Sequence, residues 1–154
     1  MARRPPRQRP VVGWREWLVL PELCETPLKA KVDTGARTSA LHAFRLEVVP
    51  GEAGPVASFE MHPVQRSARG AVRVEWPVQG FRRVRSSNGK VESRPVIRTT
   101  ASVGGITWPI DVTLTSRDAM GFRMLLGRSA LKSRFVVDPG RSFLQPAPER
   151  IPGE

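Results

Sequence analysis

The stretch KAKVDTGARTSALHA, residues 29–43, decides the fold expected for this chain. Its first half continues an alternating apolar and polar run, the pattern of a strand with one buried face. Asp33, Thr34 and Gly35 follow at once, and Gly35 permits the close approaches and unusual backbone angles of a tight loop. Asp33 is therefore either a carboxylate placed for chemistry at the end of a strand or a polar residue that only starts a turn.

Strand patterns continue on both sides of this stretch, with Gly, Pro and Asn between them. Asn88-Gly89 is a dipeptide that favours a tight hairpin turn. Only GRSALKSR, residues 127–134, is typical of a helix, and FVVDPG and SFL are expected to form a closing hairpin. The sequence thus predicts an all-β, closed barrel with one short C-terminal helix. The other expected strands lie within residues 11–20, 41–49, 71–78, 81–103 and 106–115.

The length of 154 residues suits one domain, expected over residues 11–145. Residues 1–10 are rich in Pro and Arg and are expected to form a basic disordered tail, and residues 146–154 a Pro-rich tail. No apolar run is long enough to span a membrane, and none follows the basic start as a secretory signal requires. Cys24 is the only cysteine, so no intramolecular disulfide is possible. A cytoplasmic location is expected.

The formal net charge of +11 has two interpretations. It indicates an acidic partner such as RNA, an acidic peptide or a membrane surface. Alternatively it reflects a genome that favours Arg, because 21 of the 25 basic residues are Arg and they are scattered along the chain. The Phe residues are not interleaved with basic clusters, so the sequence does not predict a base-stacking platform.

Hydrolysis of a peptide bond by a carboxylate requires a partner group. Two carboxyl groups about 3 Å apart share one proton, so one activates water while the other protonates the carbonyl oxygen. Asp111, Asp118 and Asp138 are the only other aspartates, and none lies in a second Asp-Thr-Gly context. Asp111 has the opposite parity to the apolar face of its strand and should point to solvent. The second acid is therefore expected from Asp33 of another subunit across a two-fold axis, which makes the chain a homodimer.

These motifs together resemble the retropepsin family of aspartic peptidases. The order of motifs is the same as in that family: the acid loop is VDTGA, the flap is the Gly-tipped hairpin, and the Gly-Arg stretch is MLLGRSAL. More closely, GWREW, KAKVDTGARTSALHA, VESRPVIRT and FRMLLGRSAL are similar to a bacterial branch labelled as an ATP-dependent zinc protease and linked to the ribosomal-protein glutamate ligase system. The resemblance covers residues 12–144. It implies a homodimeric aspartic endopeptidase that cleaves a peptide or protein substrate, with Glu-rich and isopeptide bonds among the candidates.

The resemblance also assigns roles to single residues. Asp33 would be catalytic, Thr34, Gly35 and Ala36 would shape the active-site loop, and Gly127 would support it. Retroviral relatives carry an acid where this chain has Arg37, so Arg128 cannot form its usual pair. Arg128 is expected instead to pair with Asp138 or Glu47, or to bond backbone carbonyls of the loop.

Two further sets of residues are candidates for contact with substrate. Arg37 would select acidic side chains, since guanidinium pairs with carboxylate in a bidentate manner, or it is a solvated surface residue. Ser87, Asn88 and Gly89 would form the tip of a flap, or of an ordinary surface hairpin.

The zinc and ATP of the branch's label find little support in the residues. No His-Glu-x-x-His motif and no Gly-rich phosphate loop with Lys occurs, so we expect no metal and no cofactor. His42 shares an apolar face with Phe44 and is expected in the core, although a site of Cys24, His42 and His62 is conceivable.

Two other functions remain open. The chain could be an inactive retropepsin-like binding module, in which Asp33→Asn would leave function intact. It could also be a basic ribosome- or RNA-associated factor that binds through residues 1–10, with an affinity that falls steeply with salt.

Overall fold

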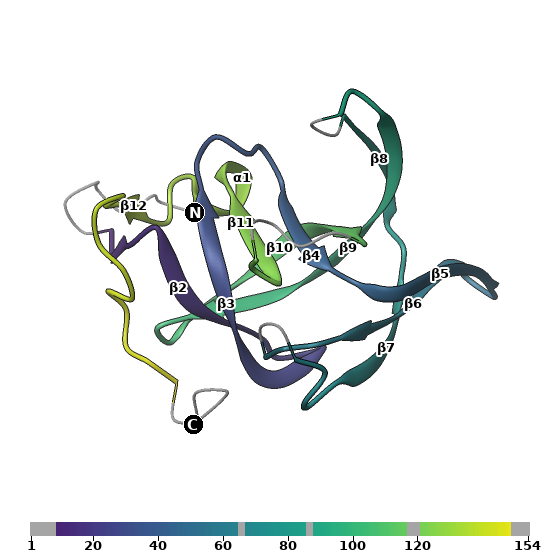
Figure 1. Cartoon of the computed structure of the whole chain (residues 1–154), viewed down its shortest axis with the longest axis horizontal. Helices are drawn as coiled ribbons and strands as arrows, with labels where there is room; N and C mark the ends of the chain where they lie inside the picture. The colour runs from purple at the N-terminus through teal and green to yellow at the C-terminus, as the bar shows by residue number, and fades with distance from the viewer. Residues whose placement is uncertain (1–8, 65–66, 86–87, 117–120, 149–154) are drawn as a thin grey trace.

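The structure is a computed structural model that describes residues 9–64, 67–85, 88–116 and 121–148 (Figure 1). These residues form twelve strands and one short helix. The strands are β1 (Val11–Val12), β2 (Arg15–Leu20), β3 (Cys24–Asp33), β4 (Ser39–His42), β5 (Phe44–Gly51), β6 (Gly54–Met61), β7 (Val72–Pro77), β8 (Gly80–Arg85), β9 (Val91–Val103), β10 (Ile106–Thr115), β11 (Met124–Gly127) and β12 (Val136–Val137), and the helix is α1 (Arg128–Leu131).

Six of the strands close into a barrel. Their order is β10-β4-β11-β3-β2-β9, and the antiparallel pairing of β9 with β10 joins the two ends of the sheet. β8 extends this sheet beyond β9, and β5, β6 and β7 form a separate three-stranded sheet beside it (Figure 1). The predicted all-β barrel with one short C-terminal helix is confirmed. Among the described residues, no helix is long and apolar enough to cross a membrane.

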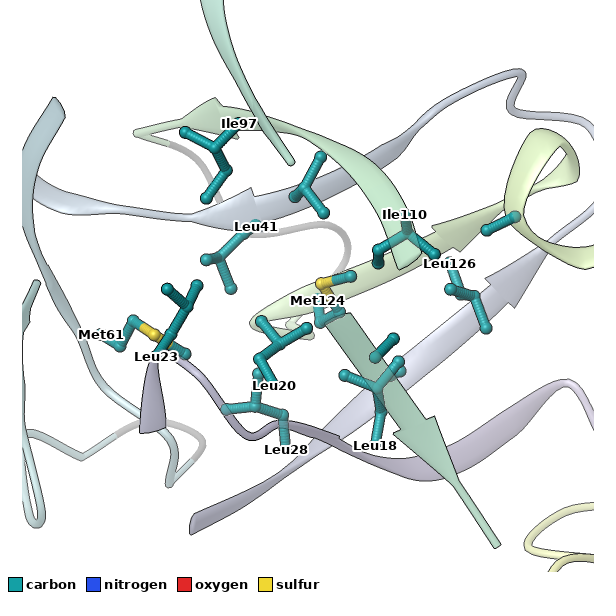
Figure 2. Close-up of a cluster of buried hydrophobic side chains, with 14 of the residues drawn as sticks. Leu18, Leu20, Leu23, Leu28, Leu41, Met61, Ile97, Ile110, Met124 and Leu126 are labelled. Atoms are coloured by element: carbon teal, nitrogen blue, oxygen red, sulfur yellow. The ribbon is translucent and has the colours of Figure 1, made fainter. Parts of the chain in front are cut away.

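The barrel interior is filled by the apolar positions of the alternating strands. On β10, Trp108, Ile110, Val112 and Leu114 are buried while Asp111 is exposed, as the period-two pattern predicts. Figure 2 shows side chains from several strands meeting in one cluster. The labelled members are Leu18, Leu20, Leu23, Leu28, Leu41, Met61, Ile97, Ile110, Met124 and Leu126.

The single strand predicted over residues 41–49 is wrong, because the chain breaks at Ala43 into β4 and β5. Arg45 has a φ of 54°, and the register of β5 against β6 shifts between Phe44 and Glu47. Leu46 still packs against the core, but beyond it both faces of β5 are exposed, with Val48 at 40% and Val49 at 39% exposure.

An aromatic stack marks the point where the two sheets meet. The ring of Phe44 lies between those of His42, at 3.9 Å, and His62, at 3.6 Å, and the Arg123 guanidinium lies 4.7 Å from its centroid. His42 is half-buried at this junction, so the prediction that it lies in the core is only partly confirmed.

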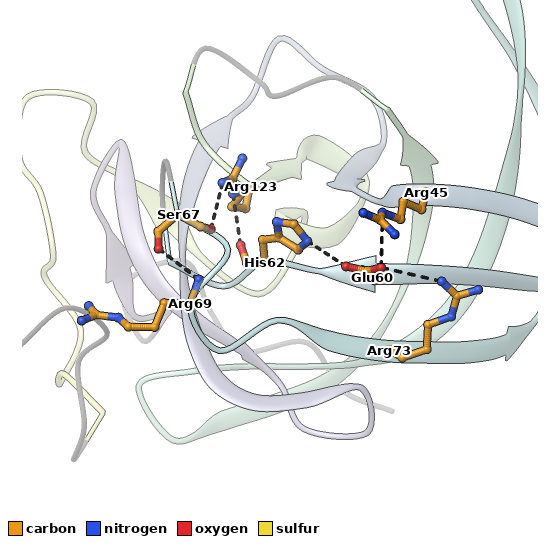
Figure 3. Close-up of polar contacts among 7 residues, drawn as sticks. All are labelled: Arg45, Glu60, His62, Ser67, Arg69, Arg73 and Arg123. Carbon is orange, nitrogen blue, oxygen red and sulfur yellow. Dashed lines mark hydrogen bonds and ion pairs between the residues drawn. The ribbon is translucent and has the colours of Figure 1, made fainter.

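Polar contacts continue this junction along β6 (Figure 3). Glu60 contacts Arg45, His62 and Arg73 at 3.6, 3.2 and 3.9 Å. Arg123 donates to the carbonyl oxygen of His62 at 3.1 Å, which ties the residue before β11 to the end of β6.

The predicted closing hairpin near the C-terminus is also wrong. β12 pairs in parallel with β1, and residues 142–144 form no strand. The buried carboxylate of Glu16 instead accepts the backbone N–H groups of Gly13, Leu144 and Gln145 at 2.7, 2.8 and 3.1 Å. These three bonds hold the C-terminal segment against the start of the chain and satisfy donors that a strand ladder would otherwise take.

Candidate active site

The Asp-Thr-Gly loop joins two strands that are not paired with each other. β3 ends at Asp33, β4 begins at Ser39, and β11 lies between them, parallel to β3 and antiparallel to β4. Gly127, the last residue of β11, is in register with Asp33. A strand from the other end of the chain therefore supports the loop from within the sheet.

The loop holds its carboxylate in a fixed orientation. Asp33 Oδ1 accepts the N–H of Gly35 at 2.9 Å, and the Asp33 carbonyl accepts the N–H of Ala36 at 3.2 Å. Asp33 is half-buried, whereas Thr34 and Gly35 are exposed. The carboxylate is thus oriented by its own turn, on a loop that a second molecule can approach.

Tight packing supports the loop from below. The buried N–H of Gly127 donates to Ser39 Oγ at 3.0 Å, and the first turn of α1 bonds the loop through Arg128 N–H to the Ala36 carbonyl at 2.7 Å. A Cβ atom at Gly127 would lie 2.5 Å from the carbonyl carbon of Thr38 and 2.6 Å from its oxygen. Only glycine fits here, because real Cβ atoms do not approach backbone so closely.

The side chain of Arg128 bonds the loop as well. Its Nη1 donates to the carbonyl oxygen of Thr34 at 3.0 Å, so of the three expected arrangements the structure has the hydrogen bond to a loop carbonyl. The structure therefore brings Asp33, the three loop residues after it, Gly127 and Arg128 together.

The other described aspartates have different surroundings. Asp111 is exposed, as predicted, and pairs with Arg98 at 2.9 Å. Asp138 Oδ1 accepts the N–H of Gly140 at 3.0 Å in the turn after β12. Asp118 lies outside the described residues.

A basic pocket of about 430 Å³ lies beside the loop, between α1, β10 and the β8–β9 hairpin. Arg37 lines it, together with Arg82, Arg98 and Arg134. Asp111 is the acid in the lining, and Arg98 already neutralises it. Arg82, Arg98 and Arg134 carry no local sequence signal for this site, because they come from separate parts of the chain that meet only in the fold.

The hairpin predicted around Asn88-Gly89 is present as β8 and β9, which pair antiparallel from Gly80↔Val96 to Arg85↔Val91. Gly89 has a φ of +84°, and Asn88 Oδ1 accepts the N–H of Lys90 at 3.1 Å. Ser87 lies outside the described residues, as do residues 1–8 of the basic tail and residues 149–154.

Cys24 is buried, and His42 and His62 are separated by the ring of Phe44. Over the part of the chain that the structure describes, no three or more His, Cys, Asp or Glu side chains gather in a group that could hold a metal ion.

Comparison with known proteins gives similarities over most of the chain. Residues 11–148 match the model of the RimB-like family, described as retropepsin-like aspartic endopeptidase RimB. A probable alpha-L-glutamate ligase of Shewanella halifaxensis (strain HAW-EB4) is 44% identical over 133 residues, which is 86% of this chain and 29% of that protein. A probable alpha-L-glutamate ligase of Parasynechococcus marenigrum (strain WH8102) is 47% identical over 129 residues, 84% of this chain and 28% of that protein. The chain therefore spans less than a third of the length of these curated relatives.

A solved structure has a similar fold. The crystal structure of a protein of unknown function from Legionella pneumophila subsp. pneumophila str. Philadelphia 1 has a TM-score of 0.70 and 27% sequence identity to this chain. The match covers 87% of this chain and 96% of that one.

Proposed function

Because this chain belongs to the RimB-like family of retropepsin-like aspartic endopeptidases, we propose that it hydrolyses peptide bonds with a dyad of Asp33 from each of two subunits. The observation that carries the proposal is the position of Asp33. Its carboxylate is oriented by the Gly35 N–H on an exposed loop, and β11 and α1 support that loop.

The reaction follows from two carboxyl groups that share one proton. The carboxylate takes a proton from water while the oxygen of that water attacks the carbonyl carbon of the substrate. The carboxylic acid of the other subunit protonates the carbonyl oxygen, which gives a tetrahedral diol. Its collapse breaks the C–N bond. The carboxyl group that took the proton from water gives it to the leaving nitrogen, and the other carboxylate takes the proton of one diol hydroxyl as the C=O bond forms again.

The dimer is proposed because each chain supplies one Asp-Thr-Gly loop. Asp111 and Asp138 are engaged elsewhere, and the exposed Thr34 and Gly35 are free to meet the same loop of a second copy. A two-fold axis through this loop would bring the two Asp33 carboxylates face to face.

We propose an acidic, Glu-containing substrate. Arg37, Arg82 and Arg134 line the pocket beside the loop without an ion-pair partner in the described part of the chain, so they can receive carboxylates. The curated relatives that contain a similar segment are named probable alpha-L-glutamate ligases, which also connects this domain with glutamate. An isopeptide bond to glutamate is a second form of the same substrate. A location in the cytoplasm stays a prediction.

The first test is peptide cleavage by wild type and by Asp33→Asn, on Glu-rich and neutral peptides, with and without a chelator. Asn preserves the acceptor for the Gly35 N–H but cannot act as a base, so we expect a folded protein without cleavage. Asp138→Asn is the matched control, because it makes the same chemical change in a turn away from the site. Undiminished cleavage by Asp33→Asn would overturn the proposal, and loss of cleavage with chelator would indicate a metal enzyme.

A second test concerns the shared dyad. Wild type and Asp33→Asn are unfolded together and refolded in equal amounts, so that subunits mix at random. If both carboxylates are required, only dimers of two wild-type subunits are active. The activity then falls to about one quarter of that of the same total amount of wild-type protein. A monomeric enzyme would keep about one half, which would refute the dyad while leaving the peptidase intact.

A further inference from the structure

The β8–β9 hairpin extends away from the closed barrel (Figure 1). β8 is the last strand of its sheet and pairs only with β9. Both faces of the hairpin beyond the barrel are therefore candidates for contact with another molecule, and they differ in composition.

Directly paired residues share a face of an antiparallel hairpin. One face carries Arg82, Val84, Glu92 and Arg94, all half-buried, with an ion pair of 3.3 Å between Arg94 and Glu92. The opposite face is mostly exposed, and we call it the outer face. It consists of Phe81, Arg83, Arg85, Val91 and Ser93.

The outer face combines free cations with exposed apolar surface. The side chains of Arg83 and Arg85 have no hydrogen bond or ion pair with any described residue. Phe81 is 56% exposed, the largest exposed fraction among the large hydrophobic side chains described, and Val91 is 44% exposed. Neither the charges nor the aromatic ring contribute to the packing of the barrel.

We infer that the outer face binds single-stranded nucleic acid. Phe81, Arg83 and Arg85 occupy alternate positions of one strand, so they lie about 7 Å apart along a line. An aromatic ring that stacks on a base, followed by cations that contact phosphates, is the combination that single-strand binding sheets use. The sequence did not predict such a platform, but Phe81 shares one face of the hairpin with Arg83 and Arg85. The net charge of +11 adds a long-range attraction for a polyanion.

Phe81 decides between nucleic acid and an acidic polypeptide. An acidic polypeptide would pair with the two arginines but would leave the exposed ring without a partner, whereas every base offers a face for stacking. Phe81 also borders the basic pocket, so a strand that begins there would run along Arg83 and Arg85 to the end of β8. This site is separate from residues 1–10, and it does not depend on the proposed peptidase activity.

The test is fluorescence anisotropy with a labelled oligouridylate of about twelve nucleotides, at about 50 to 200 mM salt. The full chain carrying Asp33→Asn is used throughout, so peptidase activity cannot affect the result. Phe81→Ala should weaken binding by about 5- to 150-fold with an unchanged salt slope, because it removes stacking but no charge. Arg83→Ala/Arg85→Ala should lower the slope of log affinity against log salt by about 1.4, or about 0.7 for each phosphate that is no longer neutralised.

Lys132→Ala/Arg141→Ala is the control, because it removes the same charge from exposed positions at the end of α1 and after β12. It should leave the salt slope unchanged, and circular dichroism establishes that each variant is folded. Equal losses in the hairpin and control pairs would overturn the inference, because they would indicate attraction by net charge alone. An unchanged affinity in Phe81→Ala would also overturn the inference. Binding of poly-L-glutamate or of phosphatidylserine vesicles in place of the oligonucleotide would overturn it as well.

Discussion

Replacement of Gly127 by Ala tests the packing that supports the proposed catalytic loop. The new methyl group would lie 2.5 Å and 2.6 Å from the carbonyl carbon and oxygen of Thr38, and 3.0 Å from the carbonyl oxygen of Ala36. All three are backbone atoms, so no side chain can rotate away and the loop itself must move. Overpacking of this kind costs about 1–3 kcal/mol, and the short distances place Gly127→Ala near about 3 kcal/mol.

A loss of about 3 kcal/mol in the free energy of unfolding lowers the melting temperature of a domain of this size by about 6–12 °C. The cleavage rate of the folded protein should fall by about 100-fold, because a shift of about 1 Å in a catalytic group has an effect of this size. This loss is additional to the loss of stability. Differential scanning calorimetry measures the first effect and kcat of the folded protein the second.

Gly80→Ala is the control for stability. Gly80 also lies in a strand, but nothing stands within 4 Å of the Cβ atom it would gain. We expect its free energy of unfolding to stay within about 0.5 kcal/mol of wild type. If Gly127→Ala has the melting temperature and the cleavage rate of wild type, then β11 does not support the loop as described.

Three further predictions concern single side chains. Glu16→Gln should lose at least about 2 kcal/mol of stability in urea unfolding, because one buried and two part-buried backbone N–H groups lose a charged acceptor, while the exposed Glu25→Gln should change little. Arg128→Met should lower kcat with a small effect on stability, because it frees the Thr34 carbonyl at an exposed position, and a larger loss of stability than of kcat would contradict this role. Arg37→Ala should raise KM for Glu-rich peptides and leave KM for neutral peptides unchanged, and an unaltered preference would show that Arg37 is only a solvated residue.

Local pattern was sufficient for much of the fold and for the centre of the site. Alternation on β10 correctly predicted which residues are buried and that Asp111 is exposed, because side chains on a strand alternate between faces irrespective of distant contacts. The alternating strands predicted the barrel, and the resemblance carried by VDTGA, the Gly-tipped hairpin and MLLGRSAL implied its loop. The same reasoning failed at residues 41–49, where the chain breaks at Ala43 into two strands and the register of β5 on β6 shifts, since pairing depends on the partner strand.

The amino-acid sequence alone predicts Asp33 as the catalytic acid and specifies the alternation that builds the barrel strands. Their surroundings come from the tertiary structure. The insertion of β11 between β3 and β4 makes Gly127 irreplaceable, and the packing of three elements gathers Arg37, Arg82 and Arg134 in one pocket. Such contacts join residues far apart in the chain. They depend on where strands lie in space, and that is settled by burial of the whole core rather than by any local run of residues.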